Sequence, residues 1–202
     1  MKHWIISYQY WKIVFADAAL SLQVPDGFVV MDDCDISLCF ARLTEGNNVW
    51  VCCRQGLMPV IRYCIGTYIP IKAAGGLVRA RNTGNAMLIA RNGHADLAKG
   101  KVEAGETLAG AALREVNEET GLQGLQIGRL ALKTYHIYNL YGGWHLKQTS
   151  WFEMWTDQEQ PVVPQTEEGI EQGEWLPVSE WRQRLSNSYS TMRDIAQTAF
   201  NQ

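Results

Sequence analysis

The chain has 202 residues and a mass of 22.8 kDa, enough for one large domain or two small ones. Hydrophobic residues make up 47% of the chain and charged residues 19%, which is typical of a folded globular protein and excludes a long charged tail. The formal net charge is only −3, so no broad field favours nucleic acid or anionic lipid as a partner. No apolar run approaches the roughly 18 residues that a membrane-spanning helix needs. Any phosphate that the protein handles must therefore be held locally.

The N-terminal segment resembles a secretory leader only faintly. Ala16-Asp17-Ala18 imitates a signal-peptidase site, but polar and charged residues interrupt the apolar stretch before it. Lys12–Ala16 and Ala19–Leu22 instead predict the two short strands of a hairpin. The first third of the chain holds all five cysteines, without a Cys-x-x-Cys pair: Cys34, Cys39, Cys52, Cys53 and Cys64. We expect these to be free buried thiols, and hence a protein of the reducing cytoplasm.

A shift in composition predicts two units. The cysteines are confined to the beginning of the chain, whereas most of the glycine- and glutamate-rich segments follow residue 66. We predict a small N-terminal α/β unit over residues 1–66 and a second domain over residues 67–202. The remaining elements predicted in the first unit are a strand at Phe28–Met31, a helix at Asp33–Leu43, a strand at Val49–Cys52 and a helix at Leu57–Tyr68. No constellation of catalytic or ligand-binding residues occurs in this unit, so its role is left open.

The second unit opens with strands separated by turns. Ile69–Arg79 predicts a long strand, in which Gly75-Gly76 indicates a bulge or a close approach of another segment. A turn at residues 81–85 leads to a strand at Ala86–Arg91, and Asn92-Gly93 turns the chain again. A loop rich in glycine is expected from there to Glu106.

Helix signals follow that loop. Thr107 predicts an N-cap, Leu108–Thr120 a helix and Gly121 its C-terminal stop. The elements predicted further along the chain are strands at Leu125–Tyr138, Leu146–Trp155 and Glu174–Val178, and helices at Ser179–Leu185 and Thr191–Phe200.

Three glutamates share one arc of the helix Leu108–Thr120. At about 100° per residue, Glu115, Glu118 and Glu119 lie together beside the apolar face. Like charges three and four residues apart cost a few tenths of a kcal/mol each, so a compensating cation is expected. Convergent carboxylates suit a hard ion such as Mg²⁺ or Mn²⁺, and the absence of adjacent His or Cys argues against zinc. Taken alone, however, the helix also fits a solvated acidic face.

A wider pattern decides between these interpretations. Its defined positions are, in order, Gly100, Glu106 after five residues, and after seven more Arg114-Glu115-Val116-x-Glu118-Glu119-x-Gly121-Leu122. This resembles the box of the Nudix hydrolase family, Gly-x5-Glu-x7-Arg-Glu-U-x-Glu-Glu-x-Gly-U, where U is a bulky aliphatic residue, and every defined position matches. Chance would produce such a match on the order of a few times in 10¹⁰ windows.

The resemblance implies an α/β (α+β) protein with the Nudix fold, a mixed sheet between helices. It also implies hydrolysis, dependent on Mg²⁺ or Mn²⁺, of a diphosphate linkage in a small molecule. Carried over by position, Glu115 and Glu119 would be the principal metal ligands with the carbonyl of Gly100. Glu118 would be a third ligand or a base. The supporting residues that the family pattern implies are Glu106, a carboxylate beside the site, and Arg114, which orients the glutamates.

The loop before the box departs from the family. Many relatives have a Trp-Asp-Leu-Pro-Lys-Gly segment there, whereas this chain has Ala95 and Ala98 in place of the Trp and the Pro. The change bears on the rigidity of the loop more than on the type of reaction. Lys99 and Lys101 flank Gly100 as candidate phosphate contacts, with ordinary surface charge as the alternative.

Residues outside the box add candidates. Family members often supply a further carboxylate from a later loop, and the spacing before Trp175 selects Glu168. Tyr138 stands where relatives that cleave dinucleoside polyphosphates tend to have a tyrosine. With His136 and Lys147 it could bind a base and phosphate, or a highly phosphorylated inositol, although aromatic residues at strand spacing are more often core.

The function predicted from the sequence is therefore hydrolysis of a diphosphate in a nucleoside diphosphate derivative, a dinucleoside polyphosphate or a diphosphoinositol. The alternatives are a catalytically weak Nudix domain acting as a nucleotide sensor or scaffold, and, more remotely, a diphosphate isomerase on the same fold. The expected partner is a small-molecule diphosphate rather than nucleic acid or membrane, and a homodimer is one candidate assembly.

Overall fold

The computed structural model describes residues 3–17, 24–32 and 36–200. By the contacts between its residues the chain divides into two compact units. The first consists of residues 1–71 and 135–147, and the second of residues 72–134 and 148–202. The boundary predicted near residue 66 stays a prediction, and residues 135–147 belong to the first unit although they lie far along the chain.

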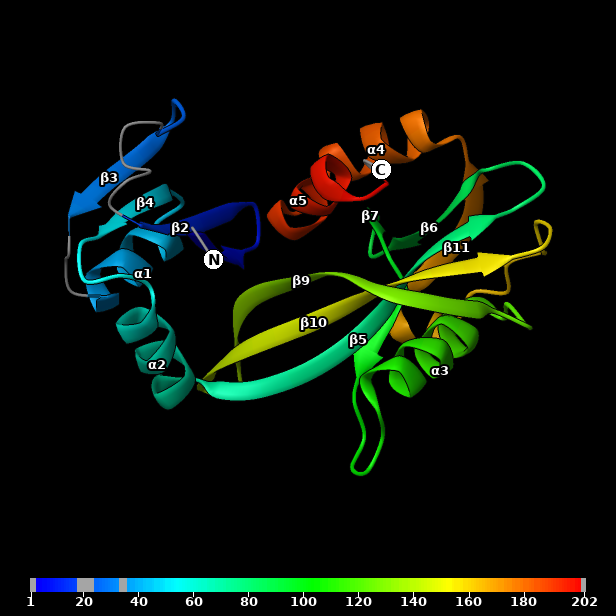
Figure 1. Ribbon diagram of the computed structural model, residues 1–202, viewed down its shortest axis with the longest axis horizontal. Coiled ribbons are helices and arrows are strands. Elements are labelled where there is room, and N and C mark those ends of the chain that lie inside the picture. The colour runs from blue at the N-terminus through cyan, green and yellow to red at the C-terminus, as the bar shows by residue number, and fades with distance from the viewer. Residues whose placement is uncertain (1–2, 18–23, 33–35, 201–202) are drawn as a thin grey trace. The chain divides into compact units, whose positions relative to one another are not determined.

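The first unit is a small α/β structure (Figure 1). Its elements in chain order are β1 (His3–Tyr8), β2 (Trp11–Asp17), β3 (Phe28–Asp32), α1 (Ile36–Thr44), β4 (Asn48–Cys53) and α2 (Met58–Thr67). Strand β1 pairs antiparallel with β2, and β4 pairs parallel with both β2 and β3. The core is rich in aromatic residues and contains Trp4, Phe15 and Phe40.

The predictions for this unit were partly right. The strand expected at Lys12–Ala16 lies within β2, but its hairpin partner is β1, a segment in which no strand was predicted. The expected strand Ala19–Leu22 lies outside the described residues. Helix α1 begins at Ile36, and residues 33–35 of the predicted helix also lie outside the described part. The four cysteines that the structure describes are buried, as expected, and no disulfide joins any two of them; Cys34 is not among them.

The second unit is a mixed sheet with helices on both faces, which confirms the predicted fold class. Its strands are β5 (Ile69–Ala80), β6 (Ala86–Arg91), β7 (His94–Asp96), β8 (Lys99–Lys101), β9 (Gln126–Leu140), β10 (Gly143–Thr156) and β11 (Ile170–Leu176). The strand order is β11-β6-β5-β10-β9, with β7 beside β6 and β8 beside β5. Both β9 and β10 continue into the first unit, as does the beginning of β5.

Three helices cover this sheet. They are α3 (Leu108–Thr120), α4 (Val178–Ser186) and α5 (Ser190–Thr198). In Figure 1, α3 lies on one face of the sheet while α4 and α5 lie on the other. Two successive residues of β5 illustrate the two faces: Leu77 packs in the cluster of α4 and α5, and Val78 packs in the cluster of α3.

Glycines permit the close packing of β5. A Cβ at Gly75 would overlap the Ala98 carbonyl oxygen, and one at Gly76 would lie 2.7 Å from the sulfur of Met154. The glycine pair therefore marks a close approach, one of the two predicted meanings. The loop expected up to Glu106 was wrong in part, because it contains β7 and β8, each of three residues and too short for a periodic signal.

The last elements also differ in their bounds from the prediction. Strand β11 begins at Ile170 rather than Glu174, and Val178 begins α4 instead of ending the strand. Helix α5 ends at Thr198, before Phe200, which has a positive φ of 58°. No helix of the described chain is long and apolar enough to cross a membrane.

Candidate active site

Helix α3 presents the acidic arc, and local sequence signals determine where the helix begins and ends. The side chain of Thr107 accepts a hydrogen bond from the backbone N–H of Gly110 at 3.0 Å, which caps the first turn. Gly121 adopts the left-handed conformation at φ 72° and stops the helix. Ala112 and Val116 lie on the apolar face of α3 and are fully buried. The cap at Thr107 and the stop at Gly121 were predicted.

Two glutamates of α3 are buried against β8. Glu119 is fully buried, and its Oε2 accepts a hydrogen bond from the backbone N–H of Lys99 at 3.0 Å. Glu115 is 8% exposed and lies against the next residue of β8, because a Cβ built on Gly100 would overlap its carboxylate. The structure thus brings together three of the predicted metal ligands, and only glycine leaves room for the Glu115 carboxylate at position 100.

Arg114 binds the outer carboxylates. Its guanidinium donates two hydrogen bonds of 3.0 Å to the two oxygens of Glu106, one of 2.8 Å to Glu115 and one of 2.9 Å to Glu118. It also donates to the backbone carbonyl of Lys101 at 3.0 Å, which ties the helix to β8. We call Arg114 and these three glutamates the outer network. The planar fork of arginine allows this many bonds in fixed directions, as the predicted orienting role requires.

Arg91 binds a second set of acids. It stands at the end of β6, donates a hydrogen bond to Oε1 of Glu119 and forms ion pairs with Asp96 at 3.7 Å and Glu168 at 3.6 Å. Asp96 in turn accepts a hydrogen bond from Nζ of Lys99 at 2.6 Å. We call these five residues the inner network. It connects Glu168, selected from the sequence on spacing alone, to Glu119 through a single arginine.

Sequence reasoning missed Arg91 and Asp96. Both are mostly buried, with side-chain exposures of 19% and 10%. A signal was present, because each is a charged residue next to an apolar run: Arg91 ends the strand that begins at Ala86, and Asp96 precedes Leu97 and Ala98. Charged residues are rarely buried unless they are paired.

Burial raises the pKa of one glutamate in each network. Desolvation raises the pKa of Glu119 and of Glu115, although Arg91 and Lys99 act in the opposite direction on Glu119 and Arg114 does so on Glu115. The hydrogen bond from Arg114 instead lowers the pKa of Glu106. Burial acts to lower the pKa of Arg91, but the charge and hydrogen bond of Glu119, together with the charges of Asp96 and Glu168, outweigh it and the net pKa is raised.

The two networks together carry excess negative charge. They hold six carboxylates, one aspartate and five glutamates, against three cationic side chains, a formal charge of −3. Hard oxygen donors with uncompensated charge fit a divalent cation by their chemistry. Within the described chain, no group of three or more His, Cys, Asp and Glu side chains is arranged to hold a metal ion; Arg91 and Arg114 donate hydrogen bonds to the carboxylates of Glu119 and Glu115.

The predicted substrate contacts are divided between the units. His136, Tyr138 and Lys147 belong to the first unit, and the ring of Tyr138 stacks on His145 with 5.4 Å between centroids. Lys99 is engaged with Asp96. The binding roles of these residues, and of Lys101, stay predictions.

Comparisons with known proteins agree on one fold. A family model described as NUDIX domain matches residues 70–196. The Escherichia coli dihydroneopterin triphosphate pyrophosphohydrolase is 21% identical, with a TM-score of 0.54 over 67% of this chain and 99% of its own. The MutT protein from Methanosarcina mazei Go1 is also 21% identical, with a TM-score of 0.52 over 64% of this chain and 92% of its own. A search among curated proteins found no match.

Proposed function

The chain belongs to the Nudix family of diphosphate hydrolases, and we propose that it hydrolyses a diphosphate linkage in a nucleoside diphosphate derivative or a related small molecule with the help of Mg²⁺ or Mn²⁺. One observation carries the proposal: the buried carboxylates of Glu115 and Glu119 lie against two successive residues of β8, Lys99 and Gly100. A merely solvated acidic face would leave these side chains in water.

Gly100, Glu115 and Glu119 are the residues that would hold the cation, with Glu118 as a further ligand or the base. The cation would neutralise the diphosphate and favour the attack of water on phosphorus. The net charge of the two networks supports this assignment, since six carboxylates with only three cationic partners would otherwise repel an anionic substrate.

The arginines position the carboxylates. Arg114 holds Glu106, Glu115 and Glu118 through hydrogen bonds of 2.8 to 3.0 Å, so that one side chain sets the orientation of three acids. Arg91 connects Glu119 to Glu168. Glu168 is therefore the second candidate for the base, because it is about half exposed and can accept a proton from water near the site.

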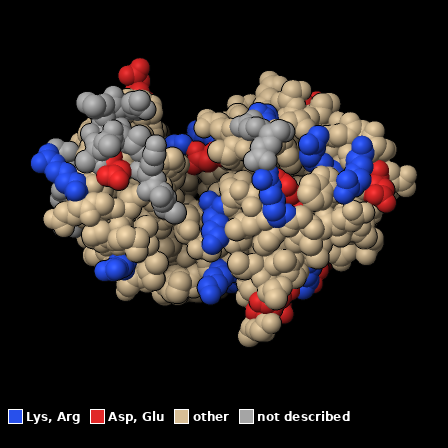
Figure 2. Space-filling view, in the orientation of Figure 1, with Lys and Arg blue, Asp and Glu red and all other residues tan. Residues whose placement is uncertain are grey.

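The substrate contacts belong to the proposal as well. We propose Lys99 and Lys101, in the second unit, as phosphate contacts. His136, Tyr138 and Lys147, in the first unit, are proposed separately as residues that bind a base or phosphate. Dinucleoside polyphosphates and diphosphoinositols stay within the proposed range of substrates. We further propose a cytoplasmic protein whose partner is the small-molecule substrate, with a homodimer as one assembly. On the face shown in Figure 2, acidic and basic side chains are scattered among uncharged ones, which supports a partner other than nucleic acid.

A substrate panel tests the proposal. The full chain is incubated with nucleotide sugars, dinucleoside polyphosphates, ADP-ribose and diphosphoinositols, each with Mg²⁺, with Mn²⁺ and with EDTA, and the products are identified by mass spectrometry. We expect cleavage of at least one diphosphate only when a cation is present. A folded protein that cleaves nothing on the panel would contradict the proposal and favour the sensor or scaffold alternative.

A glycine substitution sharpens the result. In Gly100→Ala the new methyl group would displace the Glu115 carboxylate, so turnover should fall by at least about tenfold. The matched control is Gly66→Ala in α2, where an added Cβ meets nothing within 4 Å. Equal turnover in both variants would show that Glu115 does not act from its place against β8.

A further inference from the structure

A cavity of about 320 Å³ opens on the second unit, on the side of the sheet covered by α4 and α5. It is formed by residues of β5, β9 and β10 and by the end of α5: Leu77, Arg79, Arg129, Leu130, Ala131, Leu132, Glu153, Trp155, Thr198, Ala199 and Phe200. Helix α3 packs on the other face of the sheet, through Val78 and Val116. The cavity is therefore a separate place from the carboxylate networks.

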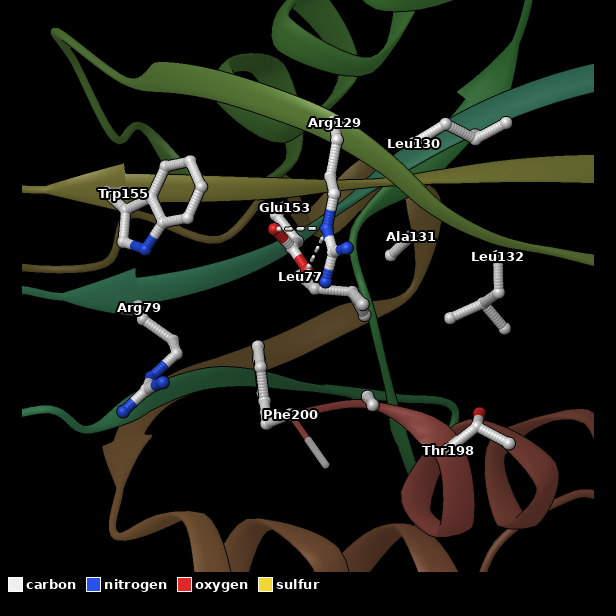
Figure 3. Close-up of a pocket in the computed structure, with 11 residues that line it drawn as sticks. Leu77, Arg79, Arg129, Leu130, Ala131, Leu132, Glu153, Trp155, Thr198 and Phe200 are labelled. Carbon is white, nitrogen blue, oxygen red and sulfur yellow. Dashed lines mark hydrogen bonds and ion pairs between the residues drawn. The ribbon is translucent and has the colours of Figure 1, made fainter. Parts of the chain in front are cut away.

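The lining of this cavity has excess positive charge. Arg129 and Glu153 neutralise one another through three contacts of 3.1 to 3.2 Å, drawn as dashed lines in Figure 3. Arg79 donates two hydrogen bonds, of 3.3 and 3.2 Å, to the carbonyl of Gly84. Among the described residues it forms no ion pair, so its charge is not compensated by a carboxylate. It also keeps N–H groups beyond these two bonds, because a guanidinium has five.

Two aromatic rings stand in the wall, and both are held in place. The indole of Trp155 lies on Gly128, where a Cβ would overlap the ring, and the guanidinium of Arg81 is 5.3 Å from its centre. The ring of Phe200 lies 5.1 Å from the guanidinium carbon of Arg79 and 5.1 Å from the ring of Trp181. These contacts mean that the walls need little rearrangement on binding, which favours affinity.

We propose that this cavity binds a small aromatic anion. The anionic group would contact Arg79, and the ring would pack against Trp155, Phe200 and the leucines that line the cavity, Leu77, Leu130 and Leu132. In Figure 3, Leu77 lies between the Arg129–Glu153 pair and Phe200, which gives the ligand an apolar surface beside the charge. The volume is at the lower end of the range for small-molecule sites, so the ligand has one or two rings. Aromatic carboxylates and mononucleotides are the two sources of this chemistry.

Calorimetric titration of the full chain tests the proposal in EDTA, which removes cation-dependent binding at the carboxylate networks. Benzoate and adenosine 5′-monophosphate are the two anionic probes, and benzamide and adenosine are their neutral counterparts. We expect saturable binding of at least one anion, at least about tenfold tighter than its neutral counterpart, because a charge-assisted hydrogen bond is lost with the charge. If only benzoate binds, the ligand is an aromatic carboxylate. If only adenosine 5′-monophosphate binds, the ligand is a mononucleotide.

Variants locate the binding. Arg79→Gln should weaken the anion at least about tenfold, whereas Arg62→Gln, the same change at an exposed arginine of α2, should not. Because Arg79 also supports the turn at Gly84, Trp155→Leu serves as a second variant and should weaken binding while Arg79 stays in place. Binding that is unchanged in both variants, or no binding of either anion to the folded wild type, would overturn the proposal. Glu119→Gln should leave the affinity for the anionic probe unchanged. The binding proposal and the proposed hydrolase activity can therefore be disproved separately.

Discussion

Two arginines divide the acids of the candidate site, and only the set around Arg91 contains a fully buried acid. Arg114 organises the outer network, where the Glu118 side chain is 48% exposed and reaches water. Arg91 organises the inner network around Glu119, which is fully buried. In the outer network the hydrogen bond from Arg114 lowers the pKa of Glu106, although burial raises the pKa of Glu115; in the inner network desolvation prevails and raises the pKa of Glu119. An arginine–glutamate pair therefore favours the ionised carboxylate at Glu106, whereas at Glu119 the ionised carboxylate is kept at a cost.

The difference indicates a division of labour. Burying a charged carboxylate costs desolvation free energy, and a neutral side chain at the same place would make the fold more stable. Stability therefore does not explain why the carboxylate is there. Glu119 is therefore the residue whose charge is most plainly retained for chemistry. The outer network, which contributes favourable hydrogen bonds, also stabilises the attachment of α3 to β8.

The largest effect is expected from Arg91→Met compared with Arg114→Met. Removing Arg91 leaves Glu119 buried without its main cation, and breaking a buried pair costs about 3–5 kcal/mol. Removing Arg114 leaves three carboxylates whose side chains are 19%, 11% and 48% exposed, all more exposed than Glu119, so the loss should be smaller. Urea unfolding in EDTA at pH 7.5 measures both values. Equal losses, or a greater loss for Arg114→Met, would contradict the distinction between the networks.

The next effect concerns turnover in Glu119→Gln. The substitution keeps size and helix propensity but removes the charge, so kcat should fall by roughly 10²-fold or more, about 2.7 kcal/mol of transition-state stabilisation. Without metal the melting temperature should not fall, because the buried charge is a cost to the fold and Arg91 keeps its ion pairs with Asp96 and Glu168. Glu167→Gln, at an exposed residue outside both networks, is the matched control and should leave kcat unchanged. Wild-type turnover in Glu119→Gln would remove Glu119 from the catalytic set.

These expectations rest on features that the sequence predicted unequally. Local signals at Thr107 and Gly121 predicted α3 with its cap and its stop, because helix ends depend on residues within a few positions of one another. The family pattern from Gly100 to Leu122 implied the roles of the acidic residues. The same pattern placed Arg114 beside Glu115 and Glu118, which lie one and four residues away on the helix.

Contacts between distant segments could not be predicted in this way. Arg91 pairs with Glu119, which lies 28 residues away in the chain. The sequence around each residue can indicate that a charge is buried, but not which residue is its partner. Likewise β1 was missed because its hydrophobic pattern is short. The sequence had also suggested Ala19–Leu22, rather than β1, as the hairpin partner of the strand that became β2. The cavity at Arg79 arises from three strands and the end of a helix, an arrangement that only the folded sheet creates.

A smaller effect is expected at Glu168, the exposed member of the inner network. If it acts as a base through water, Glu168→Gln should lower kcat by at least about tenfold without a comparable rise in KM. The neighbouring Glu167→Gln again provides the control, since it changes the same charge in the same turn. If the two variants have the same kcat, Glu168 serves only as a partner of Arg91, and Glu118 is left as the base.

The smallest effect, a difference in pH dependence, distinguishes the networks most directly. The pKa of Glu119 is raised in the folded protein, so its ionisation opposes folding. The stability of the wild type relative to Glu119→Gln should therefore fall as the pH rises above about 4.5, the ordinary value for glutamate. The pKa of Glu106 is lowered, so its contribution is present above about 4.5 and is lost as the pH falls below it. Relative to Glu106→Gln, the wild type should thus gain stability with rising pH. Urea midpoints from pH 3.5 to 7.5 in EDTA measure both differences, and slopes of the same sign would mean that burial does not distinguish Glu119 from Glu106.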